Sequence, residues 1–347
     1  MDFTVPTIDI SSYLHGGAAD DGARVEVAKE IDRACSEVGF IQIVNHGIPS
    51  RTIDDLGDAL DEFFALPTEV KKQYCAGAGP NRGYQPPNTD SLSMSLGVAP
   101  ANMMNDFYEA FTVGSEASWY PDLELPEANY ATNLWPAAAP NFRSRVETYF
   151  AAAQKLSRVL LTAFSDALGL PSDYFPGLTD HSIDVLKMNN YMLPEGEIEL
   201  AGELTGMGAH TDFGILTILW ADRVAGLQVL DRRGHWHDVM PEKEALLINL
   251  GDAMARWTND QWMSTVHRVN PPVVNGRIIR RRSCAFFFDG NHDAIIEPLN
   301  GFGADNEPVY PPISVADNIN AKLAGVRLGK VPSAVEREAQ RVLSAHE

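Results

Sequence analysis

Two residues two positions apart give the first chemical signal in this sequence. His210 and Asp212 lie in MGAHTDFGILTIL, immediately before an apolar run that is typical of a β-strand. In an extended strand, residues i and i+2 point to the same face, so an imidazole and a carboxylate are expected to meet at one spot. His267, in STVHRV, also lies next to an expected strand and is the candidate third ligand. Two histidines and one carboxylate favour non-haem iron(II) chemistry with oxygen, although a His/Asp cluster also suits zinc.

A second pair with the same spacing indicates an anion site. Arg281 and Ser283 lie two apart in RRRSCAFFF, so on a strand they share a face, while Arg280 and Arg282 point the other way. An inward-facing arginine needs an anionic partner because its desolvation is costly, and a guanidinium beside a hydroxyl is a good receptor for a carboxylate. A cosubstrate with a carboxylate at one end and an iron-chelating α-keto acid at the other would fit both pairs. The alternative interpretation is a solvated basic edge over 280–282.

Other candidate residues carry weaker signals. His235 and His237 are a further His-x-His pair, which we interpret as part of a surface strand. Cys284 faces away from Arg281 by strand alternation and is expected in the core. No glycine-rich loop precedes a helix as a phosphate or dinucleotide site requires, and no serine lies on a nucleophile elbow.

Composition and charge narrow the class of protein. The chain has 347 residues, a 45% apolar fraction and a formal net charge of −20. This charge favours solubility and argues against nucleic acid and anionic membranes as partners. No apolar run approaches the roughly 18 to 20 residues that cross a bilayer, and MDFTVPTIDI lacks the features of a signal peptide. The three scattered cysteines form no CxxC pair and no disulfide framework, so a cytoplasmic location fits best.

Helical and strand patterns alternate in the first half of the sequence. Arg24 to Val38 has apolar residues at spacings of three and four, and Gly39 follows as a C′ glycine. Ser50 is expected to cap the next helix. The segment 77–101 is rich in Gly, Pro, Asn and Ser, which predicts a long lid or binding loop. The other expected elements are strands at 5–10, 40–44 and 106–113, a helical turn over 67–74, a loop at 121–140 and an amphipathic helix over 141–170.

From Ile183 onward the period changes to that of strands. Turn residues separate short apolar segments, and Asn275-Gly276 predicts a tight hairpin. Many short strands at close spacing are typical of a jelly roll or β-sandwich. No segment resembles an interdomain linker, so we expect one domain with helices packed around a β core. The expected strands are Val185–Tyr191, Ile215–Trp220, Gly226–Leu230, Trp236–Val239, Ala245–Leu250, Ser264–Val269 and Arg277–Phe288, followed by helices at 315–323 and 335–345.

These residues together make the chain resemble the isopenicillin N synthase-like family of iron(II)/2-oxoglutarate-dependent oxygenases. The similar segments follow the family order over nearly the whole chain, and their combination is far more specific than any one motif. They are VPTIDI (5–10), GFIQIVNHGIP (39–49), LKMNNY (186–191), GAHTDFGILTIL (208–219), GLQVL (226–230), LINLGD (247–252), VHRVNPP (266–272) and RRSCAFFF (281–288). The resemblance implies mixed α and β structure, with a double-stranded β-helix, or jelly roll, flanked by helices.

The resemblance also implies how the chain is divided and which residues act. It implies a single oxygenase domain over 1–347, an N-terminal helical and lid region over 1–120, and an iron- and 2-oxoglutarate-binding core over 180–290. A structural role at a strand is the alternative for Asn189. The implied site residues are His210, Asp212 and His267 as catalytic iron(II) ligands, Arg281 and Ser283 at the distal carboxylate of 2-oxoglutarate, and Tyr191 and Asn189 beside that cosubstrate.

The activity implied by the resemblance is oxidation of a small organic molecule with O2. The enzyme would hydroxylate, desaturate or cyclise an amino-acid derivative or other secondary metabolite, with release of succinate and CO2. Two alternatives stay open: an iron oxidase of the same family that works without 2-oxoglutarate, and a non-catalytic metal-binding sensor. The substrate is expected over the iron, in a site shaped by the segment 82–107 and by the C-terminal elements. Tyr84, Met103, Met104 and Phe107 are wall candidates, with ordinary core packing as the alternative.

Overall fold

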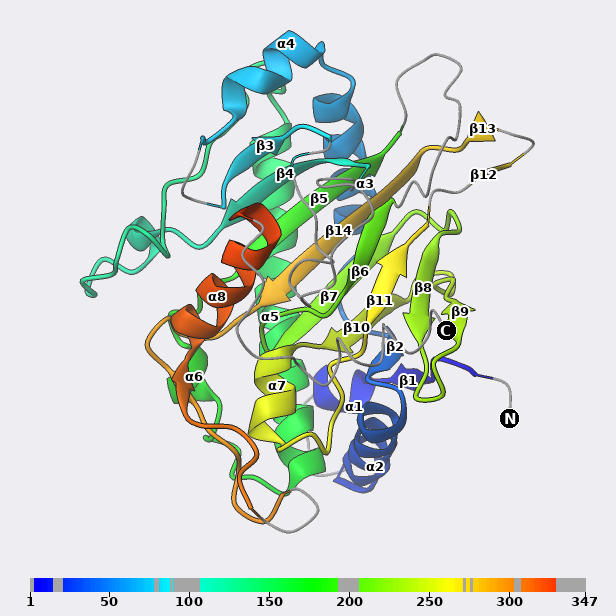
Figure 1. The fold of residues 1–347 in the computed structure, drawn as a ribbon, viewed down its shortest axis with the longest axis vertical. Helices are drawn as coiled ribbons and strands as arrows, with labels where there is room; N and C mark the ends of the chain where they lie inside the picture. Colours follow the sequence, from blue (N-terminus) through cyan, green and yellow to red (C-terminus); the bar gives the residue numbers. More distant parts are fainter. Residues whose placement is uncertain are drawn as a thin grey trace.

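Two mainly antiparallel β-sheets form the centre of the molecule (Figure 1). The structure is a computed structural model, and it describes residues 3–14, 21–77, 81–87, 89, 107–192, 206–270, 273–274, 277–302 and 307–328. The larger sheet has the strand order β1-β2-β10-β7-β14-β5-β4-β3, and the smaller sheet has the order β6-β11-β8-β9. Several strands pair with strands distant in the sequence, such as β2 with β10, β7 with β14 and β6 with β11, as in a jelly roll, and helices flank the β core.

Short strands and a few long helices make up the described chain. The strands are β1 (Thr7–Asp9), β2 (Phe40–Val44), β3 (Gly83–Gln85), β4 (Glu109–Gly114), β5 (Val185–Tyr191), β6 (Met207–His210), β7 (Leu216–Ala221), β8 (Leu227–Leu230), β9 (Trp236–Asp238), β10 (Leu246–Leu250), β11 (His267–Val269), β12 (Val273–Val274), β13 (Arg277–Ile278), β14 (Arg281–Phe288), β15 (Ile295–Ile296) and β16 (Ile313–Ser314). The α-helices are α1 (Ser11–Leu14), α2 (Asp21–Glu37), α3 (Ser50–Phe64), α4 (Thr68–Lys71), α5 (Phe142–Leu168), α6 (Pro176–Thr179), α7 (Asp252–Trp257) and α8 (Val315–Leu328). Within these ranges, no helix is long and apolar enough to cross a membrane.

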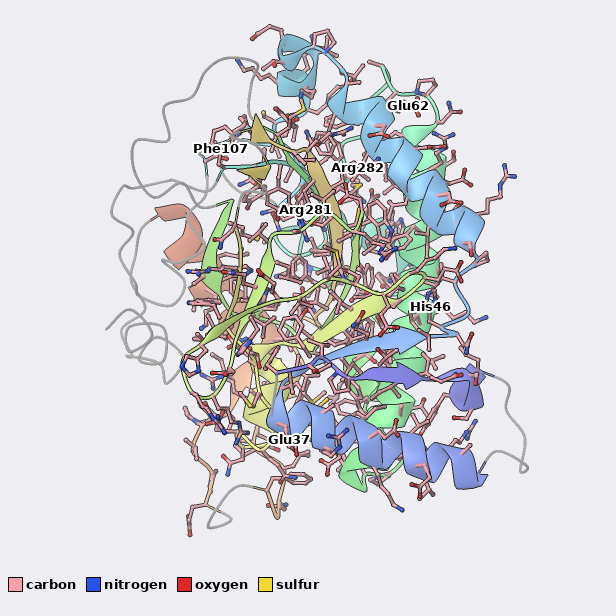
Figure 2. The ribbon with its side chains drawn as sticks, turned by 90° about the vertical axis from the view of Figure 1, so that its right-hand side faces the viewer. Glu37, His46, Glu62, Phe107, Arg281 and Arg282 are labelled. Carbon is pink, nitrogen blue, oxygen red and sulfur yellow. The ribbon has the colours of Figure 1, made fainter. Side chains whose placement is uncertain are left out.

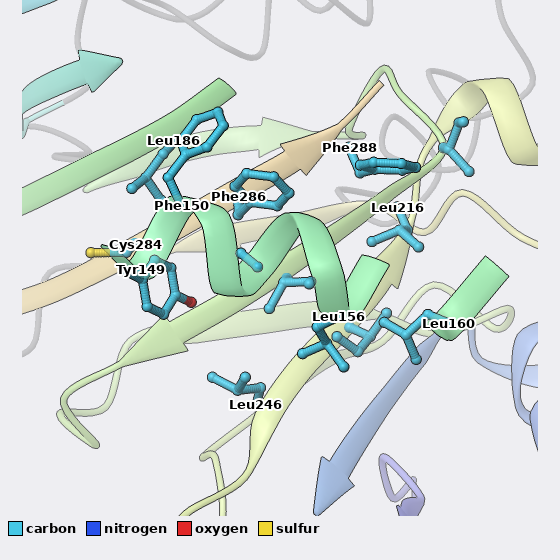
Figure 3. Packing of buried hydrophobic residues seen from close by; sticks show 14 of the residues in the cluster. Tyr149, Phe150, Leu156, Leu160, Leu186, Leu216, Leu246, Cys284, Phe286 and Phe288 are labelled. Atoms are coloured by element: carbon cyan, nitrogen blue, oxygen red, sulfur yellow. The ribbon is translucent and has the colours of Figure 1, made fainter. Parts of the chain in front are cut away.

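The longest helix, α5, covers one face of the larger sheet. Its buried residues recur at spacings of three and four, so one side of the helix is apolar. Figure 3 shows Phe150 and Leu156 of this helix among the buried side chains of the sheet. The rings of Phe150 and of Phe286 in β14 meet edge to face, with their centroids 5.1 Å apart. This packing holds β14 in place from the side that faces away from the smaller sheet.

Strands from the first third of the chain complete the larger sheet. β1 pairs in parallel with β2, β2 pairs antiparallel with β10, and β4 pairs antiparallel with β5. Gly39 joins α2 to β2 at φ 71°, as its predicted role after the helix requires. A Cβ atom at this position would collide with Thr265 and Met263, so only glycine fits. The N-terminal elements thus pack directly against the segment that precedes β11.

Most of the predicted elements are confirmed. β2 and β5 have the predicted bounds, and α2, α5, β8, β9 and β10 each differ from the prediction by only a few residues at their ends. The two halves of the predicted strand Arg277–Phe288 are separate, as β13 and β14. β12 and β13 pair antiparallel, which agrees with the predicted hairpin, although its turn at 275–276 lies outside the described residues.

Some predictions were wrong or fall outside the described residues. Ser50 is the first residue of α3 rather than its cap, because Pro49 holds that position and makes no side-chain capping bond. Helices α6 and α7 are only four and six residues long. That is too short for a 3.6-residue period to be recognised in the sequence. The predicted helix 335–345 and most of the expected lid lie outside the described residues.

Candidate active site

A cavity of about 200 Å³ lies between the two sheets, and every predicted site residue lines it. Strands β5, β7 and β14 of the larger sheet and β6, β8 and β11 of the smaller sheet supply its walls, and α8 adds a further side. Along β5 and β14, alternate residues face the cavity, while the residues between them do not line it. The period of two in the sequence therefore separates a functional face from a structural face on each strand.

His210, Asp212 and His267 converge on one spot in this cavity. His210 ends β6 and His267 begins β11, and the two are direct partners in the antiparallel register, with ring centroids 4.3 Å apart. Asp212 lies beyond the end of β6, so the prediction that one extended strand carries both His210 and Asp212 is wrong in detail. The side chains still meet, because Asp212 Oδ1 lies 3.8 Å from Nε2 of each histidine.

Backbone carbonyls fix the tautomers of both histidines. Nδ1 of His210 lies 2.7 Å from the Gly208 carbonyl oxygen, and Nδ1 of His267 lies 3.0 Å from that of Thr265. A carbonyl only accepts hydrogen bonds, so each Nδ1 carries the proton and each Nε2 keeps a free lone pair. Metal-binding histidines use this arrangement, in which the second ring nitrogen donates to a backbone or carboxylate oxygen. Both lone pairs point toward Asp212.

The carboxylate of Asp212 is held through one of its two oxygens. Thr217 Oγ1 donates to Oδ2 at 2.5 Å, and Asn249 Nδ2 donates to the same oxygen at 2.6 Å. Oδ1 is the oxygen that faces the two imidazoles. The sequence analysis did not assign Thr217 or Asn249, although both lie on inward positions of predicted strands. Their hydrogen bonds orient the carboxylate, as outer partners of metal ligands commonly do.

The protonation states of this cluster suit a metal ion. Burial and the neighbouring His267 together lower the pKa of His210 to about 3, so the His210 imidazole is neutral near pH 7. Although burial opposes ionisation of Asp212, the two imidazoles and the hydrogen bonds from Thr217 and Asn249 hold its pKa below the usual range. Neutral imidazoles and an ionised carboxylate are the forms that bind metals. The three ligand atoms lie within 4.8 Å of one another, so one ion fits among them.

Four further predicted residues form one polar group across β5 and β14. The antiparallel register places Arg281 opposite Tyr191 and Ser283 opposite Asn189. The Arg281 guanidinium lies 5.1 Å from the centroid of the Tyr191 ring, which is a cation–π distance. Arg281 is only 1% exposed, yet its Nε and Nη1 have no hydrogen-bond partner among the described residues. The Oδ1 atom of Asn189 is also buried and without a partner there.

The neighbouring arginines confirm the predicted alternation. Arg280 and Arg282 both reach Asp61 of α3, at 2.6 Å and 2.8 Å, and Arg282 also lies 3.3 Å from Asp222. Figure 2 shows Arg282 on the side of β14 nearer to α3, with Arg281 further from that helix. The alternative of a solvated basic edge therefore holds for Arg280 and Arg282 in part, but not for Arg281, which faces the cavity.

A buried carboxyl in the cavity was not singled out from the sequence. Asp289 follows directly on β14, lines the cavity and is only 7% exposed. Burial, together with the carboxylates of Asp184 and Asp212, raises the pKa of Asp289 well above its usual range. The sequence signal that predicts its position is the odd-numbered series 281, 283, 285, 287 and 289, which continues one step beyond the strand.

Two other groups of polar side chains lie outside the cavity lining. His237, on the edge strand β9, pairs with Asp231 at 2.8 Å and stacks on Phe3, which agrees with the predicted surface role. A second cluster, which the sequence analysis did not identify, consists of His181, His292 and Asp293. Asp293 is exposed and its Oδ1 lies 3.4 Å from His181 Nε2, so this group lies at the surface of the protein.

The predicted substrate-wall residues are mostly not found there. Tyr84 is a core residue, packed on Phe63, and its hydroxyl donates to Glu109 at 2.6 Å. Among the described residues, neither Tyr84 nor Phe107 lines the cavity. Met103 and Met104 lie outside the described residues. Arg82, the first residue of the predicted segment, does line the cavity, and so do residues of the C-terminal helix α8, as predicted. Phe213 lines it as well and was not predicted.

Comparison with protein families gives two matches along the chain. Residues 5–138 match the model of the non-haem dioxygenase in morphine synthesis N-terminal family. Residues 183–290 match the model of the 2OG-Fe(II) oxygenase superfamily. The second match contains every residue of the metal cluster and of the polar group around Arg281.

Individual relatives match along most of their length. A 2-oxoglutarate-Fe(II) type oxidoreductase of Emericella nidulans is 34% identical over 321 residues, which cover 90% of this chain and 88% of the relative. A homoarginine-6-hydroxylase of Oryza sativa subsp. japonica is 32% identical over 303 residues, covering 85% and 88%. A Neurospora crassa protein solved with alpha-KG and thymine has a TM-score of 0.78 at 28% identity, covering 92% of this chain and 96% of that one.

Proposed function

The chain belongs to the 2OG-Fe(II) oxygenase superfamily, and from that premise we propose that His210, Asp212 and His267 hold the iron(II) ion. We propose further that Arg281 and Ser283 hold the distal carboxylate of 2-oxoglutarate. The protein is an iron(II)- and 2-oxoglutarate-dependent oxidoreductase that acts on a small organic molecule. Iron(II) with 2-oxoglutarate supplies the oxidising chemistry, in which O2 is consumed and succinate and CO2 are released.

The observation that carries the residue assignment is the unsatisfied guanidinium of Arg281. A buried donor without an acceptor costs roughly 1 to 3 kcal/mol, and more when it is charged. Arg281 Nε and Nη1 lack an acceptor among the described residues, while its neighbours on the strand are paired. A carboxylate on this guanidinium would supply the missing acceptor, and the Ser283 hydroxyl, two residues away on the same face, would donate to it.

The chain contributes positioning rather than reactivity in this proposal. The carbonyls of Gly208 and Thr265 accept hydrogen bonds from Nδ1 of the two histidines, so Nε2 is the nitrogen of each neutral ring that can bind a metal. Thr217 and Asn249 hold Asp212 so that Oδ1 faces the histidines. The cavity walls limit access of bulk water to the cluster, since all three ligand residues are buried. The chain therefore presents a preformed set of one oxygen and two nitrogen donors on one side of a cavity.

Hydroxylation of an amino-acid derivative or other secondary metabolite is the reaction we favour. Relatives named as a homoarginine-6-hydroxylase, a proline hydroxylase and a clavatol oxidase each share about 30% or more of their residues with this chain over most of its length. Desaturation and cyclisation would use the same site.

The experiment for this proposal is anaerobic addition of iron(II) and then 2-oxoglutarate, with absorption spectra recorded at each step. We expect a weak visible charge-transfer band in the wild-type protein, and succinate after O2 is admitted. Arg281→Gln should require a higher 2-oxoglutarate concentration for the same band. Iron binding without a band would favour the oxidase that works without 2-oxoglutarate, and absence of iron binding would overturn the ligand assignment.

Three further parts of the proposal concern the chain as a whole. We propose one oxygenase domain over 1–347, with an N-terminal region over 1–120 and a binding core over 180–290. The single domain is supported by the larger sheet, in which β3 of the N-terminal region pairs with β4 and β4 pairs with β5 of the binding core. We propose a cytoplasmic location, which the three free cysteines support. We also propose that nucleic acid and membranes are not partners, which the net charge of −20 supports.

A further inference from the structure

Three charged residues of the cavity lining belong to neither the metal cluster nor the cosubstrate site: Arg82, Lys187 and Asp289. Arg82 and Lys187 donate hydrogen bonds to other parts of the fold, and Asp289 is the acidic residue of the three. It follows β14 on the same side as Arg281 and Ser283, which line the same cavity. Arg281 is the first residue of β14, and Asp289 follows its last residue, eight positions further along the chain, so the two lie at opposite ends of this wall. The carboxyl group is therefore far from the anion site that we assign to 2-oxoglutarate.

The position of Asp289 relative to the metal cluster follows from Gly214. A Cβ atom added at Gly214 would collide with the Asp289 carboxyl group, so that carboxyl lies over the backbone two residues after Asp212. Asp289 thus borders the metal cluster from the end of the cavity opposite to Arg281. A substrate that reaches the metal cluster from this end would pass beside the Asp289 carboxyl group.

The side chain of Asp289 has no hydrogen-bond or ion-pair partner among the described residues. No lysine, arginine or histidine in the described part of the chain forms an ion pair with it, and no hydroxyl or amide there donates to its side chain. The contrast with Asp184 is direct. Asp184 is also fully buried, but it accepts hydrogen bonds from Ser182 and from Gln154. Asp289, at 7% exposure, faces the cavity instead.

A carboxyl group in this position would bind a positively charged group of a ligand. Without a counter-charge, burial and the nearby carboxylates of Asp184 and Asp212 favour the protonated form of Asp289, whereas a cation beside it would favour the ionised form and make an ion pair with it. We propose that Asp289 binds an ammonium or guanidinium group of the substrate, so that the substrate class is a small organic cation. This inference rests on the proposed function, since it places the substrate in the cavity that holds the metal cluster.

The rest of this end of the cavity suits a cation with an apolar body. Phe213 and Phe287 line the cavity with their aromatic rings, and Ile319 and Leu323 of α8 add aliphatic surface. Aromatic rings attract cations at distances up to about 6 Å, and the aliphatic residues bury the hydrocarbon part of a ligand. A short alkyl chain that ends in an ammonium or guanidinium group matches these walls.

The test uses n-butylammonium, n-butylguanidinium, n-butanol and butyrate as probes. Their binding is measured by calorimetry, without oxygen, on the full-length protein loaded with iron(II) and 2-oxoglutarate. The variants are Asp289→Asn, which keeps the shape and removes the charge, and Asp293→Asn as a control on an exposed carboxylate four residues further on. We expect the wild type and the control to bind the two cations at least about 10-fold more tightly than n-butanol. Asp289→Asn should lose this preference and bind n-butanol unchanged.

Two results would overturn the inference. One is a wild-type protein that binds butyrate or n-butanol as tightly as the cations, a comparison that needs no variant. The other is a folded Asp289→Asn protein, with the wild-type melting temperature, that keeps the full cation preference. Failure of the proposed function would look different, because the charge-transfer band and the succinate would be absent from the same preparations whatever the probes show.

Discussion

The two faces of β14 carry the same kinds of residue with opposite relations to their surroundings. On the face toward the helices, Arg282 is paired with Asp61 and Asp222, and Phe286 is packed against α5. On the face toward the cavity, Arg281 has unsatisfied donors and Phe287 is only half-buried. Two adjacent arginines and two adjacent phenylalanines thus differ only in the direction in which the strand points them.

This difference separates residues that stabilise the protein from residues that are kept for a ligand. On the helix side, the charge of Arg282 is paired with carboxylates and the ring of Phe286 packs against a neighbouring ring, so both side chains interact within the fold. On the cavity side, two donors of Arg281 and the carboxyl group of Asp289 have no partner in the described part of the chain. A ligand that pairs with these groups gains affinity without displacing any contact of the protein. The predictions below compare matched residues from the two sides.

The largest effect is expected at the metal cluster. Asp212→Ala should reduce iron retention and substrate-free succinate formation by more than about 100-fold, because even outer partners of metal ligands contribute about 10- to 100-fold. His235→Ala is the control, since this histidine is 69% exposed and lies by the edge strand β9. Metal content after gel filtration and a succinate assay would measure both variants. Wild-type iron retention in a folded Asp212→Ala protein would refute the assignment.

The next effect compares the two phenylalanines. Phe286→Ala should lower the free energy of unfolding by about 3 to 5 kcal/mol, because the ring is fully buried against α5. Phe287→Ala should cost no more than about 2 kcal/mol, because its ring is half-buried at the cavity wall. Urea denaturation of both variants measures the difference. Equal losses would mean that the two faces of β14 are not distinct in packing.

A pH effect on stability is expected from the buried carboxyl group of Asp184. Burial raises the pKa of Asp184 to about 6 from its ordinary 3.8, so the folded state holds this proton more tightly than the unfolded state does. The contribution of Asp184 to stability is therefore complete below about pH 4 and is lost as the pH rises through 6, by about 3 kcal/mol in total. Asp184→Asn should remove this part of the pH dependence when unfolding is measured between pH 4 and 7. An unchanged slope would show that Asp184 is ionised throughout.

The smallest effects compare the two arginines. Arg281→Gln should weaken 2-oxoglutarate binding by about 10- to 100-fold, the value of hydrogen bonds to a charged group, with little loss of stability. Arg282→Gln should leave that affinity unchanged and lower the free energy of unfolding by about 1 kcal/mol or less, because its ion pairs are partly exposed. Titration of the charge-transfer band and urea denaturation measure the two quantities. Similar affinities for the two variants would contradict the assignment of Arg281.

The sequence by itself determined which residues face the cavity. The spacing of two between Arg281 and Ser283, and the apolar run around them, predicts one shared face of a strand, and the structure agrees. Cys284 is in the core, as the same alternation predicts, and His237 lies on an edge strand, in agreement with its predicted place in a surface strand. These predictions hold because the direction of a side chain on a strand depends on its position relative to its neighbours in the chain.

Only the tertiary structure decided how those residues are satisfied. His210 and His267 are register partners because β6 pairs with β11. The proton on each Nδ1 is placed by the backbone carbonyls of Gly208 and Thr265. Asp289 is a candidate ligand-binding residue because no donor among the described residues contacts its side chain, and no spacing in the sequence reveals that. Pairing of distant strands fixes which polar groups meet. The sequence therefore specifies the direction of each side chain, while the fold decides whether its hydrogen-bonding and charge capacity is used or left for a ligand.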